Sequence, residues 1–196
     1  MIASFEGEVL SIPELEQKLQ FTFLPHIAFE SPQEEKLVRE KGLTHPVSPQ
    51  AKELGTQYIS QIQASYLPPV SIRFLSPAIG YGLFAEEAIA AGAYVGEYTG
   101  IVRQNDRTHF EPLNNYCYEY PIPDEIGRSY VIDATKGHLT RFINHSFTPN
   151  LKPIHVFYDG YFHLIFLTLV PIEKGTQLTF NYGRNYWNLR EPPAAL

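Results

Sequence analysis

The pattern of apolar and polar residues along the chain changes near residue 70. Before that point three segments begin with signals typical of helix starts. Ser11 and Ser31 each lie three residues before a Glu, as in a capping box, and Ser48-Pro49 begins the third segment. That third segment carries apolar residues at helical spacing, namely Ala51, Leu54, Tyr58 and Ile62. We therefore expect a helical N-terminal extension over residues 1–69, whose apolar stripes serve as packing surface.

From Val70 onward the chain consists of short β-type runs separated by Gly, Pro and Asn. Asp159-Gly160 between two of these runs indicates a tight hairpin. No long helical segment separates the runs, so the pattern predicts a mostly β fold with some α structure and disfavours a parallel α/β sheet. The candidate strands are Val70–Leu75, Tyr94–Val102, Tyr116–Tyr120, Tyr130–Asp133, His155–Tyr158, Tyr161–Thr168 and Gln177–Phe180.

Composition narrows the class of protein. A chain of 196 residues can bury a core without a metal or a disulfide. Its single cysteine, Cys117, excludes a disulfide framework and a cysteine zinc cluster within one chain. The longest apolar run is strand-sized, and the N-terminus lacks the features of a secretory signal. We therefore expect a soluble protein without a membrane partner.

The net charge of −6 is concentrated near the N-terminus. Residues 1–40 hold eight Glu against two Lys and one Arg, whereas the rest of the chain is nearly neutral. This balance argues against direct nucleic-acid binding, which depends on neutralising phosphates. The acidic residues are interpreted as a solvated helix face, with a docking surface for a basic protein as the alternative.

One glycine-rich segment, Gly80-Tyr81-Gly82-Leu83-Phe84-Ala85, matches the dinucleotide-binding fingerprint. That interpretation needs a long helix directly afterwards, but Gly92 follows within two helical turns. A dinucleotide site is therefore disfavoured. The two glycines still allow the backbone to approach a ligand closely, although a simple turn explains them equally well.

Two further segments carry polar or aromatic residues that could form a site. Arg141 to Ser146 leads from apolar Phe-Ile into polar Asn-His-Ser, which suggests an irregular hydrogen-bonding loop. In Gly175 to Gly183, Phe180 and Tyr182 share one strand face. Taken alone, each segment is better explained as structure than as a ligand site. Zinc ligation is not expected at His138, His145, His155 or His163, because no metal-ligand spacing accompanies them.

Taken together with Gly96–Gly100 and Tyr130–Ala134, these segments resemble the SET-domain family of protein lysine methyltransferases. The match runs over residues 70–183 and is similar to the small, zinc-free, stand-alone bacterial kind. The resemblance implies a SET-domain β-fold of small curved sheets with a pseudoknot, in which the Asn144-His145 segment passes under a loop. The implied division is an extension over 1–69, a SET domain over 70–183 and a closing segment over 184–196.

The resemblance also implies a role for individual residues, with S-adenosylmethionine as the cofactor. Tyr182 would be the catalytic tyrosine at the point of methyl transfer. The lysine channel would be lined by Tyr98, Tyr118 and Phe180. The residues implied in cofactor binding are Gly80, Tyr81, Gly82, Tyr116, Arg141, Asn144, His145 and Trp187.

The sequence departs from the family pattern after Asn-His-Ser. Many members have a Cys at the next position that helps to bind zinc, whereas this chain has Phe147 and no later Cys. We therefore expect no metal site and no zinc requirement. Residues 184–196 would close the cofactor site instead, with Trp187 over the adenine.

The expected function is methylation of a lysine in a histone or histone-like basic protein. Phe180, at a position where family members have Phe or Tyr, leads us to expect di- or trimethylation. The alternatives are a catalytically silent SET-fold binding module and a methyltransferase acting on a non-histone protein. The resemblance implies a location in the bacterial cytoplasm, or in the nucleus of a host cell if the protein is a secreted effector. Cys117 lies in a β-type run and is interpreted as a packed side chain, not a nucleophile.

Overall fold

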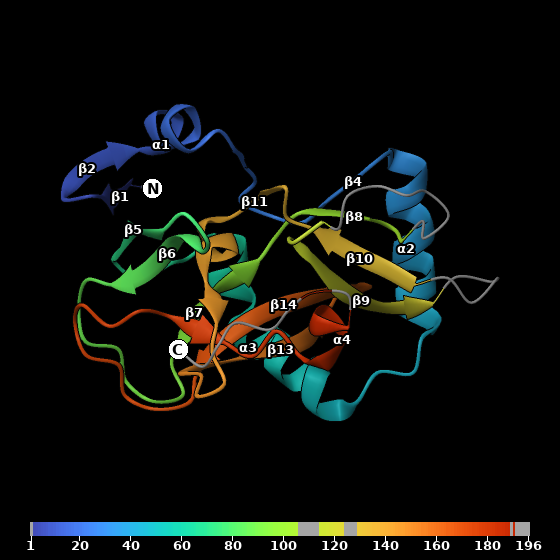
Figure 1. Ribbon diagram of the computed structural model, residues 1–196. Helices are drawn as coiled ribbons and strands as arrows, with labels where there is room; N and C mark the ends of the chain where they lie inside the picture. The colour runs from blue at the N-terminus through green and yellow to red at the C-terminus, as the bar shows by residue number, and fades with distance from the viewer. Residues whose placement is uncertain (1, 106–113, 124–128, 189, 191–196) are drawn as a thin grey trace.

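The computed structural model describes residues 2–105, 114–123, 129–188 and 190 (Figure 1). The three expected N-terminal helices are present as α1 (Ile12–Leu19), α2 (Pro32–Thr44) and α3 (Pro49–Gln63). Two of their caps form as the sequence indicates. The Ser31 hydroxyl accepts a hydrogen bond from the N–H of Glu34, and the Ser48 hydroxyl accepts one from the N–H of Ala51, both at 3.1 Å.

The N-terminal extension contains strands in addition to the three expected helices, and the local sequence pattern did not predict these strands. Four short strands are present: β1 (Ile2–Phe5), β2 (Glu8–Ser11), β3 (Thr22–Phe23) and β4 (Ala28–Phe29). β1, β3 and β4 pair in parallel with three strands of the later region, namely β5 (Val70–Ser76), β11 (Lys136–Gly137) and β8 (Ile101–Gln104). Strands of two to four residues are too short to show an alternating pattern, and their partners are distant in the sequence.

The rest of the chain is mostly β, as expected. The larger sheets have the orders β2-β1-β5-β6, β4-β8-β10-β9 and β13-β14-β7. Asp159 and Gly160 both have positive φ in the turn between β13 and β14, which confirms the predicted hairpin. The strands are β5 (Val70–Ser76), β6 (Gly80–Ala85), β7 (Tyr94–Tyr98), β8 (Ile101–Gln104), β9 (Cys117–Pro123), β10 (Ser129–Asp133), β11 (Lys136–Gly137), β12 (Asn144–His145), β13 (Leu151–Tyr158), β14 (Tyr161–Thr168) and β15 (Thr179–Phe180).

Two predicted elements differ from the structure. The glycine-rich segment over 80–85 is the strand β6 and forms a hairpin with β5. The predicted strand Tyr94–Val102 divides into β7 and β8 at Thr99-Gly100. A Cβ at Gly100 would lie 2.4 Å from the carbonyl oxygen of Asp133, so this crossing requires a glycine.

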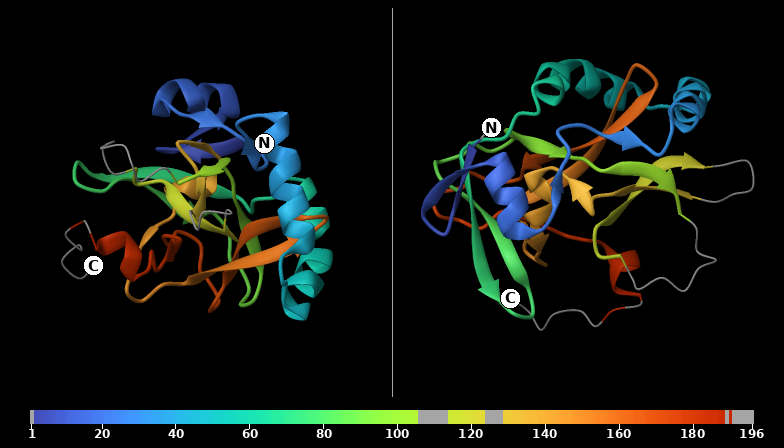
Figure 2. Two further views of the ribbon diagram at one scale, coloured as in Figure 1. Left: turned by 90° about the vertical axis from the view of Figure 1, so that its right-hand side faces the viewer. Right: turned by 90° about the horizontal axis from the view of Figure 1, so that it is seen from above.

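The helices α2 and α3 lie along one side of the molecule, next to the β13–β14 hairpin (Figure 2). Gly42 of α2 and Gly55 of α3 permit this packing, because a Cβ at either position would overlap the hairpin backbone. The short helix α4 (Arg184–Trp187) lies on the opposite side in both views of Figure 2. The 3₁₀ helix η1 (Leu139–Phe142) leads into β12.

Candidate active site

Two segments distant in the sequence meet at the pairing of β12 with β15. The strands are parallel, with Asn144 opposite Thr179 and His145 opposite Phe180. The same segment reaches β6, since the N–H of Leu178 donates to the carbonyl of Leu83 at 2.8 Å. The three motifs singled out in the sequence therefore converge at one place, as the expected pseudoknot requires.

Tyr182 lies at the end of this junction. Its hydroxyl donates to the carbonyl oxygen of Ile143 at 3.0 Å, and its ring lies 4.7 Å from that of Phe180 and 4.6 Å from that of Tyr186. Burial raises the pKa of Tyr182, so the side chain remains a neutral phenol. Because its proton is donated to Ile143, the oxygen keeps its lone pairs as acceptors.

The residues implied for the lysine channel lie together beside Tyr182. The ring centroids of Tyr98 and Tyr118 are 6.0 Å apart, and those of Tyr118 and Phe180 are 6.2 Å apart. The Tyr98 hydroxyl donates to the carbonyl oxygen of Tyr116 at 2.8 Å, which holds this ring in place. Burial also raises the pKa of Tyr98. These contacts form an aromatic cluster, composed of Tyr98, Tyr118, Phe180 and Tyr182.

The glycines of β6 approach the β12 segment closely. A Cβ at Gly82 would lie 2.8 Å from Nε2 of Gln177 and 3.1 Å from Nδ2 of Asn144, so a larger residue would fill this space. The Asn144 amide donates to the carbonyl oxygen of Tyr81 at 3.0 Å. The Tyr81 ring packs against other aromatic rings instead, so the backbone is what this residue offers to the site.

His145 has one ring nitrogen available for a ligand. Its Nδ1 accepts a hydrogen bond from the N–H of Tyr182 at 3.1 Å, and burial lowers its pKa, which favours the neutral ring. A neutral imidazole with Nδ1 as acceptor carries its proton on Nε2. This N–H is buried and has no hydrogen-bond partner within the part of the chain that the structure describes.

Trp187 and Arg141 flank His145 and the aromatic cluster. The Trp187 ring lies 4.8 Å from the ring of His145 and is nearly parallel to that of Tyr182. The Arg141 guanidinium lies 4.0 Å from the ring centre of Tyr116, and burial lowers its pKa. The structure therefore brings the residues implied by the family resemblance to one region, except for Gly80, which is placed only as the first residue of β6.

The unpartnered atoms of this region fit S-adenosylmethionine. Nε2 of His145, Nε of Arg141 and Nε1 of Trp187 are all buried N–H donors without a partner among the described residues. Buried donors are normally paired, so these three suit a ligand rich in acceptors. Adenine nitrogens, ribose oxygens and a carboxylate are such acceptors. Because Gly82 has no side chain, a group of the ligand can lie directly against the backbone there.

One residue that supports the candidate active site, Arg190, was not identified from the sequence. The Arg190 guanidinium donates to the carbonyl oxygens of Asn114 and Tyr186 and to the Asn115 side chain, at 3.0–3.1 Å, and lies 4.2 Å from the ring centre of Tyr186. These contacts tie the segment after α4 to the turn before β9. Nothing in the sequence marks Arg190, because two of its partners, Asn114 and Asn115, lie about 75 residues away. Leu189 and residues 191–196 of the expected closing segment lie outside the described residues.

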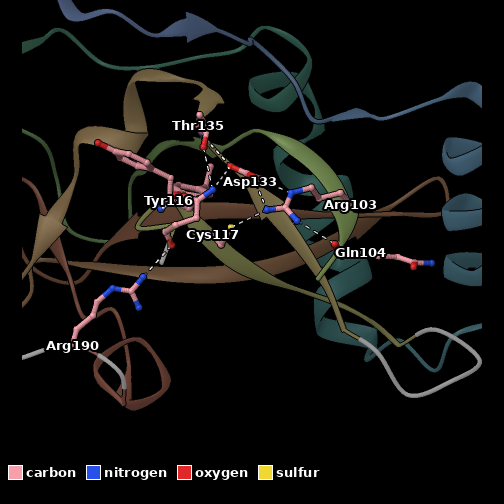
Figure 3. A network of polar contacts seen from close by, with 9 residues as sticks. Arg103, Gln104, Tyr116, Cys117, Asp133, Thr135 and Arg190 are labelled. Atoms are coloured by element: carbon pink, nitrogen blue, oxygen red, sulfur yellow. Dashed lines mark hydrogen bonds and ion pairs between the residues drawn. The ribbon is translucent and has the colours of Figure 1, made fainter. Parts of the chain in front are cut away.

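A polar network beside Arg190 supports the same turn (Figure 3). Arg103 and Asn114 donate to the carboxylate of Asp133 at 2.8–2.9 Å. Burial alone would raise the pKa of Asp133, but hydrogen bonds from Thr135, Arg103 and Asn114 hold it below its ordinary value. Burial, with the nearby Asp133 charge, raises the pKa of Cys117 to about 11, which disfavours the nucleophilic thiolate.

Two features are not found in the described parts of the chain. No group of three or more His, Cys, Asp or Glu side chains among these residues could hold a metal ion. Within the described ranges, no helix has the length and apolar character needed to cross a membrane.

Known proteins with the same arrangement identify the family. Residues 80–183, more than half of the chain, match the SET domain. The histone-lysine N-methyltransferase EZH2 of Chaetomium thermophilum is 36% identical over 121 residues, which are 57% of this chain but 8% of that protein. A crystal structure of ATXR5 in complex with histone H3.1 superposes with a TM-score of 0.66 at 17% identity, covering 91% of this chain and 86% of that one. A structure of ctPRC2 bound to S-adenosylmethionine has a TM-score of 0.52 at 27% identity, covering 72% of this chain and 19% of that one. This protein belongs to the SET-domain family.

Proposed function

We propose that this protein transfers methyl groups from S-adenosylmethionine to a lysine side chain of a basic partner protein. The observation that carries the proposal is the position of Tyr182 between two groups of residues. Its ring contacts Phe180 of the aromatic cluster on one side and His145 and Trp187 on the other. We infer from these contacts that the hydroxyl of Tyr182 faces the point at which a lysine nitrogen and a cofactor methyl group would meet.

The aromatic cluster suits a lysine that must lose its proton before it reacts. Free lysine has a pKa of about 10.4, and burial among aromatic rings favours its neutral form. When bound, S-adenosylmethionine supplies an electrophilic methyl group on a positively charged sulfur. Tyr182 keeps its lone pairs free to orient the amine, since its own proton is donated to Ile143. The raised pKa values of Tyr98 and Tyr182 argue against a phenolate base, so water is the expected proton acceptor.

The relatives support the class of substrate. EZH2 of Chaetomium thermophilum is named a histone-lysine N-methyltransferase, and the ctPRC2 structure contains S-adenosylmethionine. We propose a histone or a histone-like basic protein as the substrate of this chain. Direct nucleic-acid binding is not part of the proposal, because the net charge is −6.

Mass spectrometry can test this function. The purified protein is incubated with methyl-deuterated S-adenosylmethionine and with core histones, a bacterial histone-like protein or a whole-cell extract. Labelled methyl groups on lysine are expected with the wild type and not with Tyr182→Phe. If S-adenosylhomocysteine binds in calorimetry but no lysine in any of the three samples becomes labelled, the protein is a binding module and the proposal is wrong. If only a non-histone protein becomes labelled, the proposed methyltransferase activity is supported and the proposed histone substrate is wrong.

A further inference from the structure

A pocket of about 300 Å³ lies away from the aromatic cluster, between the N-terminal extension and the β13–β14–β7 sheet. Its walls come from both regions. The extension contributes His26 and residues of α3, and the sheet contributes Glu97 together with residues of the β13–β14 hairpin. The polar side chains of the lining include Gln63, Glu97, Tyr158, Asp159, Tyr161 and His163.

A bulge in β7 places Glu97 on this face of the sheet. Tyr94 pairs with Leu167 and Glu97 with Ile165, with a register shift between the two pairs. One extra residue in β7 therefore leaves Tyr94 and Glu97 on the same face, beneath α3. Tyr98, the next residue, points to the opposite face and joins the aromatic cluster.

Glu97 is a buried carboxylate with one oxygen unsatisfied. The residue is 3% exposed, and its Oε1 lies 2.7 Å from Nδ1 of His163. Its Oε2 is buried and has no hydrogen-bond partner in the described ranges of the chain. Leaving a buried acceptor unpaired costs about 1–3 kcal/mol, and more for a charged group. A donor supplied from the pocket would remove this cost.

The chemistry of the lining selects a cation as that donor. Glu97 and Asp159 are acidic, the lining includes neither Lys nor Arg, and His163 beside Glu97 is charged only if protonated. Arg39 pairs with Asp159, with its Nη2 2.6 Å from Oδ1. Metal binding is disfavoured, because no metal-binding group of three side chains is present in the described segments. Tyr158, Tyr161 and Gln63 add hydrogen-bonding groups, and Ile59 adds an apolar wall.

We propose that this pocket binds one ammonium or guanidinium group, with Glu97 as its ionic partner. The cation is either a small organic molecule or a Lys or Arg side chain of a partner protein, since both present the same charged donor. The site is formed by the N-terminal extension and by the face of the β13–β14–β7 sheet that carries Glu97. Its occupation does not depend on the cofactor site or on methyl transfer.

Calorimetry on the whole chain tests the proposal with two kinds of probe. Ethylammonium and N-methylguanidinium chloride represent free cations, and end-blocked tripeptides with a central Lys or Arg represent side chains. Binding of either kind is expected with the wild type. Binding of the peptides alone assigns the site to a protein partner, and binding of the free cations alone assigns it to a small molecule.

Three variants show whether the probes bind in this pocket or elsewhere on the protein. Glu97→Gln removes the charge, and Gln63→Lys places a resident cation at the exposed end of α3. Glu97→Gln is expected to weaken binding at least about tenfold, because a hydrogen bond to a charged group is lost. Gln63→Lys is expected to weaken it to a similar extent, because the added ammonium repels the ligand and competes with it for Glu97. Gln57→Lys makes the same charge change on an α3 residue that does not line the pocket, and should bind as the wild type does.

The same experiments can overturn the proposal. Circular dichroism shows whether Glu97→Gln folds. If it does not fold, the proposal is tested by comparing the affinities of Gln63→Lys and Gln57→Lys for the probes. Absence of binding by every probe, or binding that Gln63→Lys leaves unchanged, would show that this pocket is not a cation site. Neither result bears on whether the protein methylates lysine, which the labelled-cofactor assay measures separately.

Discussion

The Tyr182 hydroxyl donates to the carbonyl oxygen of Ile143 across 3.0 Å, directly before the Asn144-His145 strand. The N–H of Tyr182 donates in turn to Nδ1 of His145. Both ends of this tyrosine are therefore oriented by the segment that carries the cofactor residues. Geometry at the proposed transfer point and geometry at the cofactor site are coupled through a single residue.

Tyr182→Phe is expected to abolish methyl transfer while leaving cofactor affinity within a few-fold of wild type. The ring contacts and the backbone bond to His145 remain, and only the hydroxyl that orients the amine is lost. Activity is measured by labelled methyl transfer, and affinity by calorimetry with S-adenosylhomocysteine. A variant that retains wild-type activity on the best substrate would remove Tyr182 from its proposed role.

Asn144→Ala is expected to weaken S-adenosylhomocysteine binding roughly 5- to 150-fold, the range for losing one buried hydrogen-bond partner. The variant also loses the bond to the Tyr81 carbonyl that holds β6 beside β12. Asn185→Ala, at an exposed position of α4, is the matched control and should bind normally. Equal affinities for the two variants would contradict the assignment of Asn144.

Phe180 leads us to expect di- or trimethylation by the wild type and mostly monomethylation by Phe180→Tyr. A hydroxyl at this position could hold an ordered water in the space that a methylated amine needs, and a well-bonded water is harder to displace. Phe180 is 4% exposed and packs against Phe166 and Tyr182, so an added hydroxyl would enter a confined space. Mass spectra of the product decide the question under excess cofactor. A wild type that stops at one methyl group would defeat this expectation.

Arg190→Ala is expected to raise the KM for S-adenosylmethionine by about tenfold, with a smaller effect on kcat, because its hydrogen bonds secure the segment that carries Trp187. Arg190→Lys should have a KM close to that of Arg190→Ala, because an ammonium cannot reproduce the contacts of the planar guanidinium. Arg184→Ala, an exposed α4 position, serves as the control. Equal KM values for Arg190→Ala and Arg184→Ala would rule out the positioning role.

His138 is expected to make the fold sensitive to acid. Burial lowers the pKa of His138 from 6.5 to about 4. The unfolded chain therefore binds more protons between these values, and the free energy of unfolding should fall by up to about 3 kcal/mol as the pH drops through this window. His138→Phe should lose less stability over the same range. Urea unfolding at pH 7.5 and pH 4 measures both proteins, and identical losses would exclude His138 as the cause.

The sequence by itself determined the elements with strong local signals. The three N-terminal helices, the Asp159-Gly160 hairpin and most later strands follow from caps, glycines and alternation, which act over a few residues. It also determined the family, because five motifs kept their order and spacing. The roles of the individual site residues remain predictions from that resemblance.

Only the tertiary structure decided how those residues meet. The strands β1 to β4 exist through pairing with distant partners, a contribution that no local pattern reveals. The same holds for the bonds from Arg190 to Asn114 and Asn115, about 75 residues away, and for the β7 bulge that turns Glu97 away from Tyr98. Which residues of a strand lie on a given face of the sheet depends on how the strand is paired with its neighbour. This register is a property of the folded sheet and not of either strand alone.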